Sequence, residues 1–259
     1  SLTESRVFIN GPAGSGKELI ARKIHKQSKR QKGPFVILNG ALLDIKKYEL
    51  ELFGEEKDNG TILYGALEKA SSGTLLIDEI SEIPIETQSK ILRVLIDQNF
   101  KRISGSHVIN VDVRIICSST KDIKKEIELG NFREDLYHRL NVLEIKVEPL
   151  KNRISDVTPL VDYFSEKISL NYNLKKLKIK TNNQYLLNYE WPGNVRELRN
   201  LIERIAILSP DTDDKISNII KESLKTPDIM STPLEKSLSV PLKEARENFE
   251  KEYLTTQLK

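Results

Sequence analysis

Gly11-Pro12-Ala13-Gly14-Ser15-Gly16-Lys17 is a glycine-rich stretch between an apolar run at 7–9 and a segment of helical periodicity at 19–24. Strand, loop and helix in this order form the setting of a phosphate-binding P-loop. The glycines let backbone N–H groups face an anion, and the start of the following helix adds partial positive charge. Lys17 would then reach the β- and γ-phosphates of a nucleotide. The stretch predicts a nucleotide-binding α/β domain.

A second motif, Asp78-Glu79, ends the continuous apolar run 74–77. A strand of that kind is covered on both faces, and doubly wound sheets bind ligands at the carboxyl ends of such strands. Asp78 can hold Mg²⁺ directly or through water, and Glu79 can accept a proton from water aimed at the γ-phosphate. An acidic pair after a strand is often only the solvent-exposed end of that strand. The phosphate-binding loop at residues 11–17, called the cradle below, favours the catalytic interpretation. The residue after Lys17 is Glu18 instead of the usual Ser or Thr, so a hydroxyl ligand for Mg²⁺ must come from elsewhere.

The pattern of the remaining chain predicts a parallel sheet wrapped by helices, because strands and helices alternate up to Pro149. We expect a helix over 42–53 with core positions Leu42, Ile45, Leu50 and Phe53. A further helix is expected to begin at Pro84, with a buried stripe of Ile91, Leu92, Leu95 and Ile96. The expected strands are 7–9, 35–38, 74–77, 113–117 and 143–147.

After Pro149 the pattern is helical, with Ser155 and Asn194 as expected N-caps. The second of these helices has core spacing through to Leu208. The expected organisation is an α/β nucleotide-binding domain at 1–150, truncated at its start, a helical lid at 151–224, a linker at 225–240 and a further helix at 241–259.

The composition is that of an ordinary water-soluble protein, with 41 basic and 38 acidic residues and a formal charge of +3, which gives no strong polyanion-binding signature. Cys117 is the only cysteine, so no internal disulfide can form, and a reducing cytoplasm is expected. No apolar run of transmembrane length and no signal peptide is visible, so no membrane partner is expected. The three histidines show no ligand spacing, which argues against zinc.

Arg133 and Arg139 lie six residues apart, a spacing that does not align them on one helical face. Surface ion pairing would be the ordinary explanation for such arginines. Phosphoryl transfer, however, needs cations on the developing phosphate charge, and a neighbouring subunit often supplies them.

Several motifs together resemble the NtrC-family AAA+ transcription activators over roughly residues 6 to 209, in the same order along the chain. The motifs are the cradle with Glu18, Glu51-Leu52-Phe53-Gly54, Gly73-Thr74-Leu75-Leu76-Ile77-Asp78-Glu79-Ile80, Phe132-Arg133-Glu134-Asp135-Leu136 and Trp191-Pro192-Gly193-Asn194-Val195-Arg196-Glu197-Leu198. Glu18 is usual in this family.

The resemblance implies ATP and Mg²⁺ as cofactors, with Gly11, Pro12, Ala13, Gly14, Ser15, Gly16, Lys17 and Glu18 around the phosphates. It implies that Asp78 and Glu79 are the Walker B pair, and that Asn39 pairs with the catalytic glutamate. Arg133 and Arg139 match arginine fingers that enter the next subunit's site, and Arg196 matches the sensor arginine of the lid. An active hexameric or heptameric ring, with a dimer as an inactive form, follows from this match.

The chain departs from the family in the segment 55–67, which lacks the Gly-Ala-Phe-Thr-Gly-Ala loop of members that remodel sigma-54 polymerase. Its absence argues against that contact. A second departure is Cys117-Ser118-Ser119-Thr120, where relatives commonly end the strand with Thr-Asn; Ser119 or Thr120 can still orient water. The chain also starts abruptly, and the family's adenine-enclosing segment before the first strand is absent from it.

The tail from Pro241 resembles the linker and entry helix before a Fis-type DNA-binding domain of response regulators. The resemblance therefore implies a bacterial, cytoplasmic, nitrogen-related two-component regulator that meets DNA and a sensor histidine kinase through domains outside this chain. Two functions remain open: an ATPase that requires oligomerisation, or a nucleotide-gated oligomerisation module that controls DNA binding without remodelling. A small-molecule P-loop kinase is disfavoured, because no acceptor pocket is evident.

Overall fold

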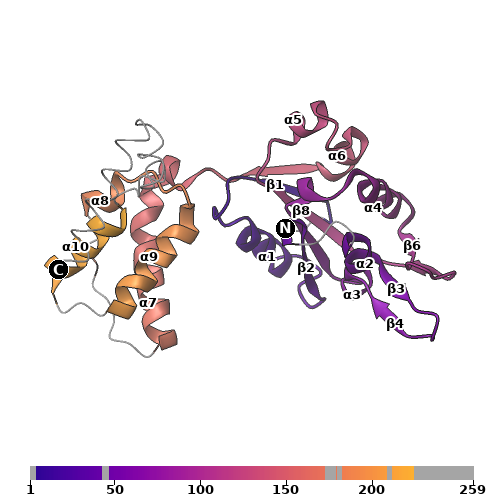
Figure 1. Ribbon diagram of the computed structural model, residues 1–259, viewed down its shortest axis with the longest axis horizontal. Coiled ribbons are helices and arrows are strands. Elements are labelled where there is room, and N and C mark those ends of the chain that lie inside the picture. Colours follow the sequence, from indigo (N-terminus) through magenta and orange to yellow (C-terminus); the bar gives the residue numbers. More distant parts are fainter. Residues whose placement is uncertain (1–3, 43–46, 173–178, 180–182, 209–211, 225–259) are drawn as a thin grey trace, which may run out of the picture.

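A five-stranded parallel sheet forms the centre of the computed structural model, which describes residues 4–42, 47–172, 179, 183–208 and 212–224 (Figure 1). The strand order is β2-β5-β8-β1-β9, with β1 paired in parallel to both β8 and β9. The expected α/β architecture is confirmed. The strands are β1 (Val7–Asn10), β2 (Phe35–Asn39), β5 (Thr74–Asp78), β8 (Arg114–Ser119) and β9 (Leu143–Lys146).

The central strands β1, β5 and β8 have apolar residues in their middle because both faces of the sheet are covered. Along β5, Leu75 and Ile77 pack into one apolar layer, while Leu76 packs into the opposite layer with Val7 and Ile116. This alternation follows from the two-residue period of a strand.

Helices cover both faces of the sheet. Ala21 of α1 (Lys17–Lys26) lies in the layer with Leu76, whereas α2, α3, α4 and α6 contribute to the layer with Leu75. The helices of this part are α2 (Tyr48–Phe53), α3 (Ala66–Lys69), α4 (Ile85–Asp97), α5 (Ile123–Glu128) and α6 (Glu134–Leu140), with the 3₁₀ turns η1 (Gly40–Leu42) and η3 (Ile80–Glu82).

Two antiparallel hairpins project from the sheet domain: β3 (Gly54–Glu56) with β4 (Ile62–Tyr64), and β6 (Asn99–Lys101) with β7 (Val108–Asn110) (Figure 1). The first hairpin occupies the segment that departs from the family pattern. Its residues Ile62, Leu63 and Tyr64 are exposed.

The chain continues as helices gathered to one side of the sheet (Figure 1). Trp191 is the largest fully buried side chain in their shared core, and its Nε1 donates to Leu186 O (3.0 Å). These elements are η4 (Leu150–Asp156), α7 (Val157–Tyr172), α8 (Gln184–Leu187), α9 (Asn194–Leu208) and α10 (Asp213–Leu224).

Some local expectations were wrong. The helix expected over 42–53 spans only Tyr48–Phe53 in the described residues, and its Leu50 is half-buried. Ile96 (56% exposed) and Leu208 (58%) face solvent at the last turns of their helices, although helical spacing placed them in the core.

Ser155 does not cap a helix, because it lies inside the 3₁₀ segment η4, where the chain kinks at Arg153. No helix in the described part of the chain is long and apolar enough to cross a bilayer. Ile45, the expected linker at 225–240 and the expected helix at 241–259 lie outside the described residues.

Candidate nucleotide site

The glycine-rich loop follows β1 and ends where Lys17 opens α1, as the sequence predicts. Gly14 (φ 71°) and Gly16 (φ 103°) adopt positive φ, a conformation that glycine reaches without steric cost. Lys17 is 6% exposed, and its Nζ donates to Gly11 O (2.9 Å) and Pro12 O (3.4 Å). The lysine is thus folded over the cradle and held by its carbonyls.

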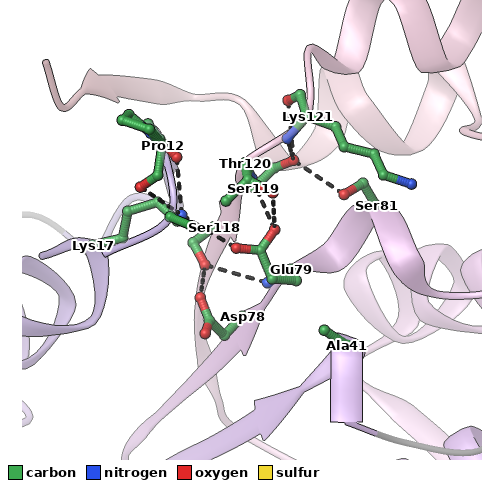
Figure 2. Close-up of polar contacts among 12 residues, drawn as sticks. Pro12, Lys17, Ala41, Asp78, Glu79, Ser81, Ser118, Ser119, Thr120 and Lys121 are labelled. Atoms are coloured by element: carbon green, nitrogen blue, oxygen red, sulfur yellow. Dashed lines mark hydrogen bonds and ion pairs between the residues drawn. The ribbon is translucent and has the colours of Figure 1, made fainter. Parts of the chain in front are cut away.

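The acidic pair lies beside this lysine (Figure 2). Lys17 Nζ is 3.2 Å from Glu79 Oε1, and Glu79 is only 15% exposed. Parallel pairing explains the meeting, because β1 and β5 both end at the same edge of the sheet. Glu79 itself adopts a left-handed conformation (φ 53°, ψ 53°), an unfavourable state for a glutamate.

Polar groups at the end of β8 hold the acidic pair (Figure 2). Thr120 donates both its backbone N–H and its hydroxyl to Glu79 Oε2, each at 2.8 Å. Ser118 Oγ donates to Asp78 Oδ1 and accepts from the Glu79 N–H (3.4 Å). Of the two residues expected to orient water, Thr120 contacts Glu79, whereas the buried Ser119 hydrogen-bonds to Ser81 Oγ (3.1 Å).

Asn39 lies at the end of β2, directly opposite Asp78 in the sheet register. Its Nδ2 donates to Asp78 Oδ2 (3.4 Å), and its Oδ1 accepts from the Ala41 N–H (2.9 Å). The resemblance pairs this asparagine with the glutamate, but here its partner is the neighbouring aspartate. Glu79 is instead taken by Lys17 and Thr120.

Among the residues that the structure describes, Asp78 is the acidic side chain at this edge that fits a Mg²⁺ ligand, because Glu79 is paired with Lys17 and Glu18 with Arg22. Glu18 accepts from Arg22 Nε (2.8 Å) and is half exposed on the outer face of α1. The described residues contain no group of three or more His, Cys, Asp or Glu side chains able to hold a metal. This donor set fits Mg²⁺, which commonly uses one or two carboxylates together with water and phosphate oxygens.

The lid contacts the cradle through three successive backbone carbonyls, an arrangement the sequence did not predict. Asn194 Nδ2 donates to Ala13 O (2.9 Å), the Arg196 N–H donates to Gly14 O (3.3 Å), and Arg153 Nη2 donates to Ser15 O (2.8 Å). The approach is so close that a Cβ on Gly14 would lie 2.3 Å from Gly193 O.

Asn194 was expected to be an N-cap, but its side chain bridges two parts of the chain instead. It is 2% exposed, has φ 52°, and its Oδ1 accepts from the Leu150 N–H (2.7 Å) while its Nδ2 holds the cradle. Arg196 is the expected sensor arginine. Its backbone N–H contacts the cradle at Gly14 O, and its side chain is exposed.

Arg133 and Arg139 lie at opposite ends of α6, Arg133 as the residue before the helix and Arg139 in its last turn. Arg133 pairs with both oxygens of Asp135 (3.0 and 2.6 Å) and donates to Ser89 Oγ (3.1 Å). This pairing raises the pKa of Arg133 and lowers the pKa of Asp135. Arg139 is exposed, and in the described contacts neither side chain touches the cradle of its own chain.

The fold and site define a P-loop nucleotide-binding domain of the AAA+ class, a parallel sheet with a helical lid. The chain belongs to the sigma-54 interaction domain family, which matches residues 1–146. Residues 151–232 match the AAA+ ATPase lid domain.

Among curated relatives, the chain is similar to the nitrogen assimilation regulatory protein NtrX of Azorhizobium caulinodans, with 45% identity over 99% of this chain and 58% of that protein. It is also similar to an NtrX-like response regulator of Rickettsia felis, with 43% identity over 99% of this chain and 56% of the relative. The chain therefore spans somewhat more than half the length of these relatives.

Solved structures agree with this assignment. NtrX from Brucella abortus in complex with ADP has 43% identity and a TM-score of 0.82, covering 99% of this chain and 58% of that one. The same protein in complex with ATP has 43% identity and a TM-score of 0.79, with coverages of 99% and 57%.

Proposed function

We propose that this chain binds ATP in the cradle of residues 11–17 and hydrolyses it to ADP and phosphate. The observation that carries the proposal is the 3.2 Å pair of Lys17 and Glu79, because it brings the phosphate-binding cation and the acidic motif together. Two similar structures, of NtrX from Brucella abortus, contain ADP and ATP, which supports the choice of nucleotide.

In this mechanism, Lys17 exchanges its carboxylate partner for the β- and γ-phosphates. Glu79 is then free to accept a proton from the water that attacks the γ-phosphate in line. Thr120, which holds Glu79 by two hydrogen bonds, fixes the direction of that carboxylate. Asn39 and Ser118 would orient the Asp78 carboxylate, because each donates a hydrogen bond to one of its two oxygens.

Mg²⁺ would be held by Asp78, directly or through water, together with phosphate oxygens. When bound, the ion neutralises charge that develops on the phosphate oxygens. The hydrogen bonds from Ser118 and Asn39 leave Asp78 with further lone pairs for such an interaction. On the lid side, Arg196 would contact the nucleotide from the end of the cradle that its backbone already touches.

The remaining cations would come from another copy of this chain, because Arg133 and Arg139 do not contact their own cradle in the described residues. Each would act on the nucleotide of an adjoining protomer, which requires a ring of six or seven copies. A dimer would then be a resting form in which the fingers are not engaged.

The whole protein would be a nitrogen-related two-component transcription regulator. This rests on the names of its relatives, a nitrogen assimilation regulatory protein and an NtrX-like response regulator. Contacts with a sensor kinase and with DNA would lie outside residues 1–259.

A second candidate is a nucleotide-gated oligomerisation module that controls DNA binding without remodelling sigma-54 polymerase. One observation favours it: the family's Gly-Ala-Phe-Thr-Gly-Ala loop is replaced by the short hairpin β3–β4, with Ile62, Leu63 and Tyr64 exposed. The two candidates share the nucleotide site and differ in whether hydrolysis and remodelling follow.

Steady-state ATP turnover measured against concentration of the full-length protein tests the proposal. Specific activity should rise with concentration as protomers assemble, and Arg133→Ala should abolish the rise while leaving ATP binding intact. Binding without turnover at any concentration would reject hydrolysis in favour of the second candidate. Absence of nucleotide binding would reject both.

A further inference from the structure

Gln88 is a polar residue of α4 whose side chain is fully buried, with 0% of its surface exposed. Its amide makes three hydrogen bonds, which use both N–H donors and one lone pair of the oxygen. Its Nε2 donates to Ile83 O (2.8 Å) and to Asn131 O (3.0 Å), and its Oε1 accepts from the Arg133 N–H (2.9 Å). The orientation of the amide is determined by these partners, since two carbonyls require donors and one N–H requires an acceptor.

These bonds join two segments that the nucleotide site uses. Ile83 lies just beyond η3, four residues after Glu79, while Asn131 and Arg133 flank the turn that enters α6. Gln88 therefore ties the segment after the acidic motif to the loop that carries the arginine finger.

The neighbouring residue on α4 completes the arrangement. Ser89 Oγ donates to Ile85 O (3.2 Å) and accepts from Arg133 Nη1 (3.1 Å). Gln88 thus fixes the backbone of Arg133, and Ser89 together with Asp135 fixes its guanidinium. Two successive residues of one helix set both the position and the direction of this arginine.

We propose that Gln88 is a positioning residue for Arg133, which it holds ready for the nucleotide of an adjoining protomer. This inference rests on the proposed function, in which Arg133 acts in trans. The bland alternative is that Gln88 only satisfies buried polar groups of its own chain. The two differ in prediction: a positioning residue affects turnover at the neighbour's site and leaves nucleotide binding at its own site unchanged.

The first test follows the Arg133 amide directly. Gln88→Met removes the three hydrogen bonds while keeping a flexible side chain of similar length. By hydrogen–deuterium exchange of the full-length protein, the amide of Arg133 should exchange about tenfold faster or more, with residues 11–17 unchanged. Ile91→Val, a core change one turn along α4, is the matched control and should leave the Arg133 amide protected. Unchanged exchange in Gln88→Met would overturn the proposal.

The second test uses mixed assemblies. Gln88→Met should lower kcat at least about tenfold with little change in ATP affinity, as expected for a group acting only in the transition state. An equal mixture with Glu79→Gln protomers, whose own sites are disabled but whose fingers are intact, should be more active than either variant alone. A mixture of Gln88→Met with Arg133→Ala should show no such gain.

The outcomes separate the two proposals. A kcat loss that Glu79→Gln protomers do not restore, or an unchanged kcat, would overturn the positioning role. If the wild-type protein shows no turnover, hydrolysis is rejected, and the exchange of the Arg133 amide still decides whether Gln88 holds the finger loop.

Discussion

Replacing Glu79 with glutamine should tighten ATP binding while it abolishes hydrolysis. The Lys17 ammonium is shared between Glu79 Oε1 (3.2 Å) and the carbonyl of Gly11 (2.9 Å). A triphosphate entering the cradle must displace that carboxylate and then lie beside its negative charge. Glu79→Gln keeps the shape of the side chain and removes both obstacles.

The size of the effect follows from the distance and the burial. At 3.2 Å and an effective dielectric constant near 20, the Coulomb attraction between Lys17 and Glu79 is roughly 5 kcal/mol. Desolvation offsets much of this, and hydrogen bonds to charged groups contribute about 1.5–3 kcal/mol net. Removing the competing carboxylate should therefore lower the Kd for ATP roughly ten- to hundredfold.

Isothermal titration calorimetry with ADP and with a non-hydrolysable ATP analogue measures this change without turnover. Glu82→Gln is the matched control, because Glu82 lies three residues further on and pairs with Lys121 (2.9 Å) instead of Lys17. It removes the same formal charge and should change the Kd less than about twofold, as solvent screens an exposed pair. Weaker or unchanged nucleotide binding by Glu79→Gln would refute the competition between carboxylate and phosphate.

Three further changes test other parts of the structure. Lys17→Ala should weaken ATP binding by roughly a hundredfold or more, because the phosphates lose their charge-assisted partner; calorimetric binding near the wild-type Kd would contradict this. Asn194→Asp should lower the free energy of unfolding by about 1–3 kcal/mol in urea denaturation, since the Ala13 carbonyl loses its 2.9 Å donor and a carboxylate replaces an amide that is 2% exposed; an unchanged midpoint would show that this contact adds nothing to stability. Burial lowers the pKa of His25, whose Nδ1 lies 2.9 Å from Thr74 Oγ1. As the pH falls below about 6.5, the unfolded chain therefore takes up a proton before the folded chain does, and the free energy of unfolding should drop. The variant His25→Gln should flatten this pH dependence.

The sheet and the acidic edge could be predicted from the sequence because their signals are local. The strands expected at 7–9, 74–77 and 113–117 correspond to β1, β5 and β8, whose apolar residues are buried on both faces. Parallel strands share one carboxyl edge, so two motifs at strand ends had to meet. The contact of Lys17 with Glu79 bears out that geometric reasoning.

Helical periodicity was less reliable near helix ends. Ile96 and Leu208 have core spacing, yet both lie in last turns, beyond the neighbours that would cover them. Ser155 has the chemistry of an N-cap, but the chain already turns as a 3₁₀ segment from Leu150. Helical spacing predicts the face of the helix on which a side chain lies. It does not predict how far along the helix other elements cover that face.

The long-range contacts of Asn194 and Gln88 were beyond sequence reasoning. Asn194 reaches Ala13 across 181 positions, and Gln88 reaches Arg133 across 45. A single amide that bonds to distant backbone atoms leaves no periodic or spacing signal. The one local hint was the Trp-Pro-Gly-Asn break before α9, which is equally typical of an N-cap. There, the positive φ of Asn194 points its side chain to the cradle instead of its own helix.

The hairpin β3–β4 is separate from the candidate nucleotide site in the contacts of the described residues. Arg102, from the second hairpin, donates to both oxygens of Glu68 (2.8 and 2.6 Å) and lies over the ring of Tyr64 (5.5 Å). The altered segment is therefore braced by charged and aromatic contacts of its own. None of these residues contacts Lys17, Asp78 or Glu79 in the described structure, so loss of the family's loop motif requires no change in the groups that would cleave ATP. Because the two regions are separate, a change in the protein that the hairpin contacts would be compatible with retained ATP turnover.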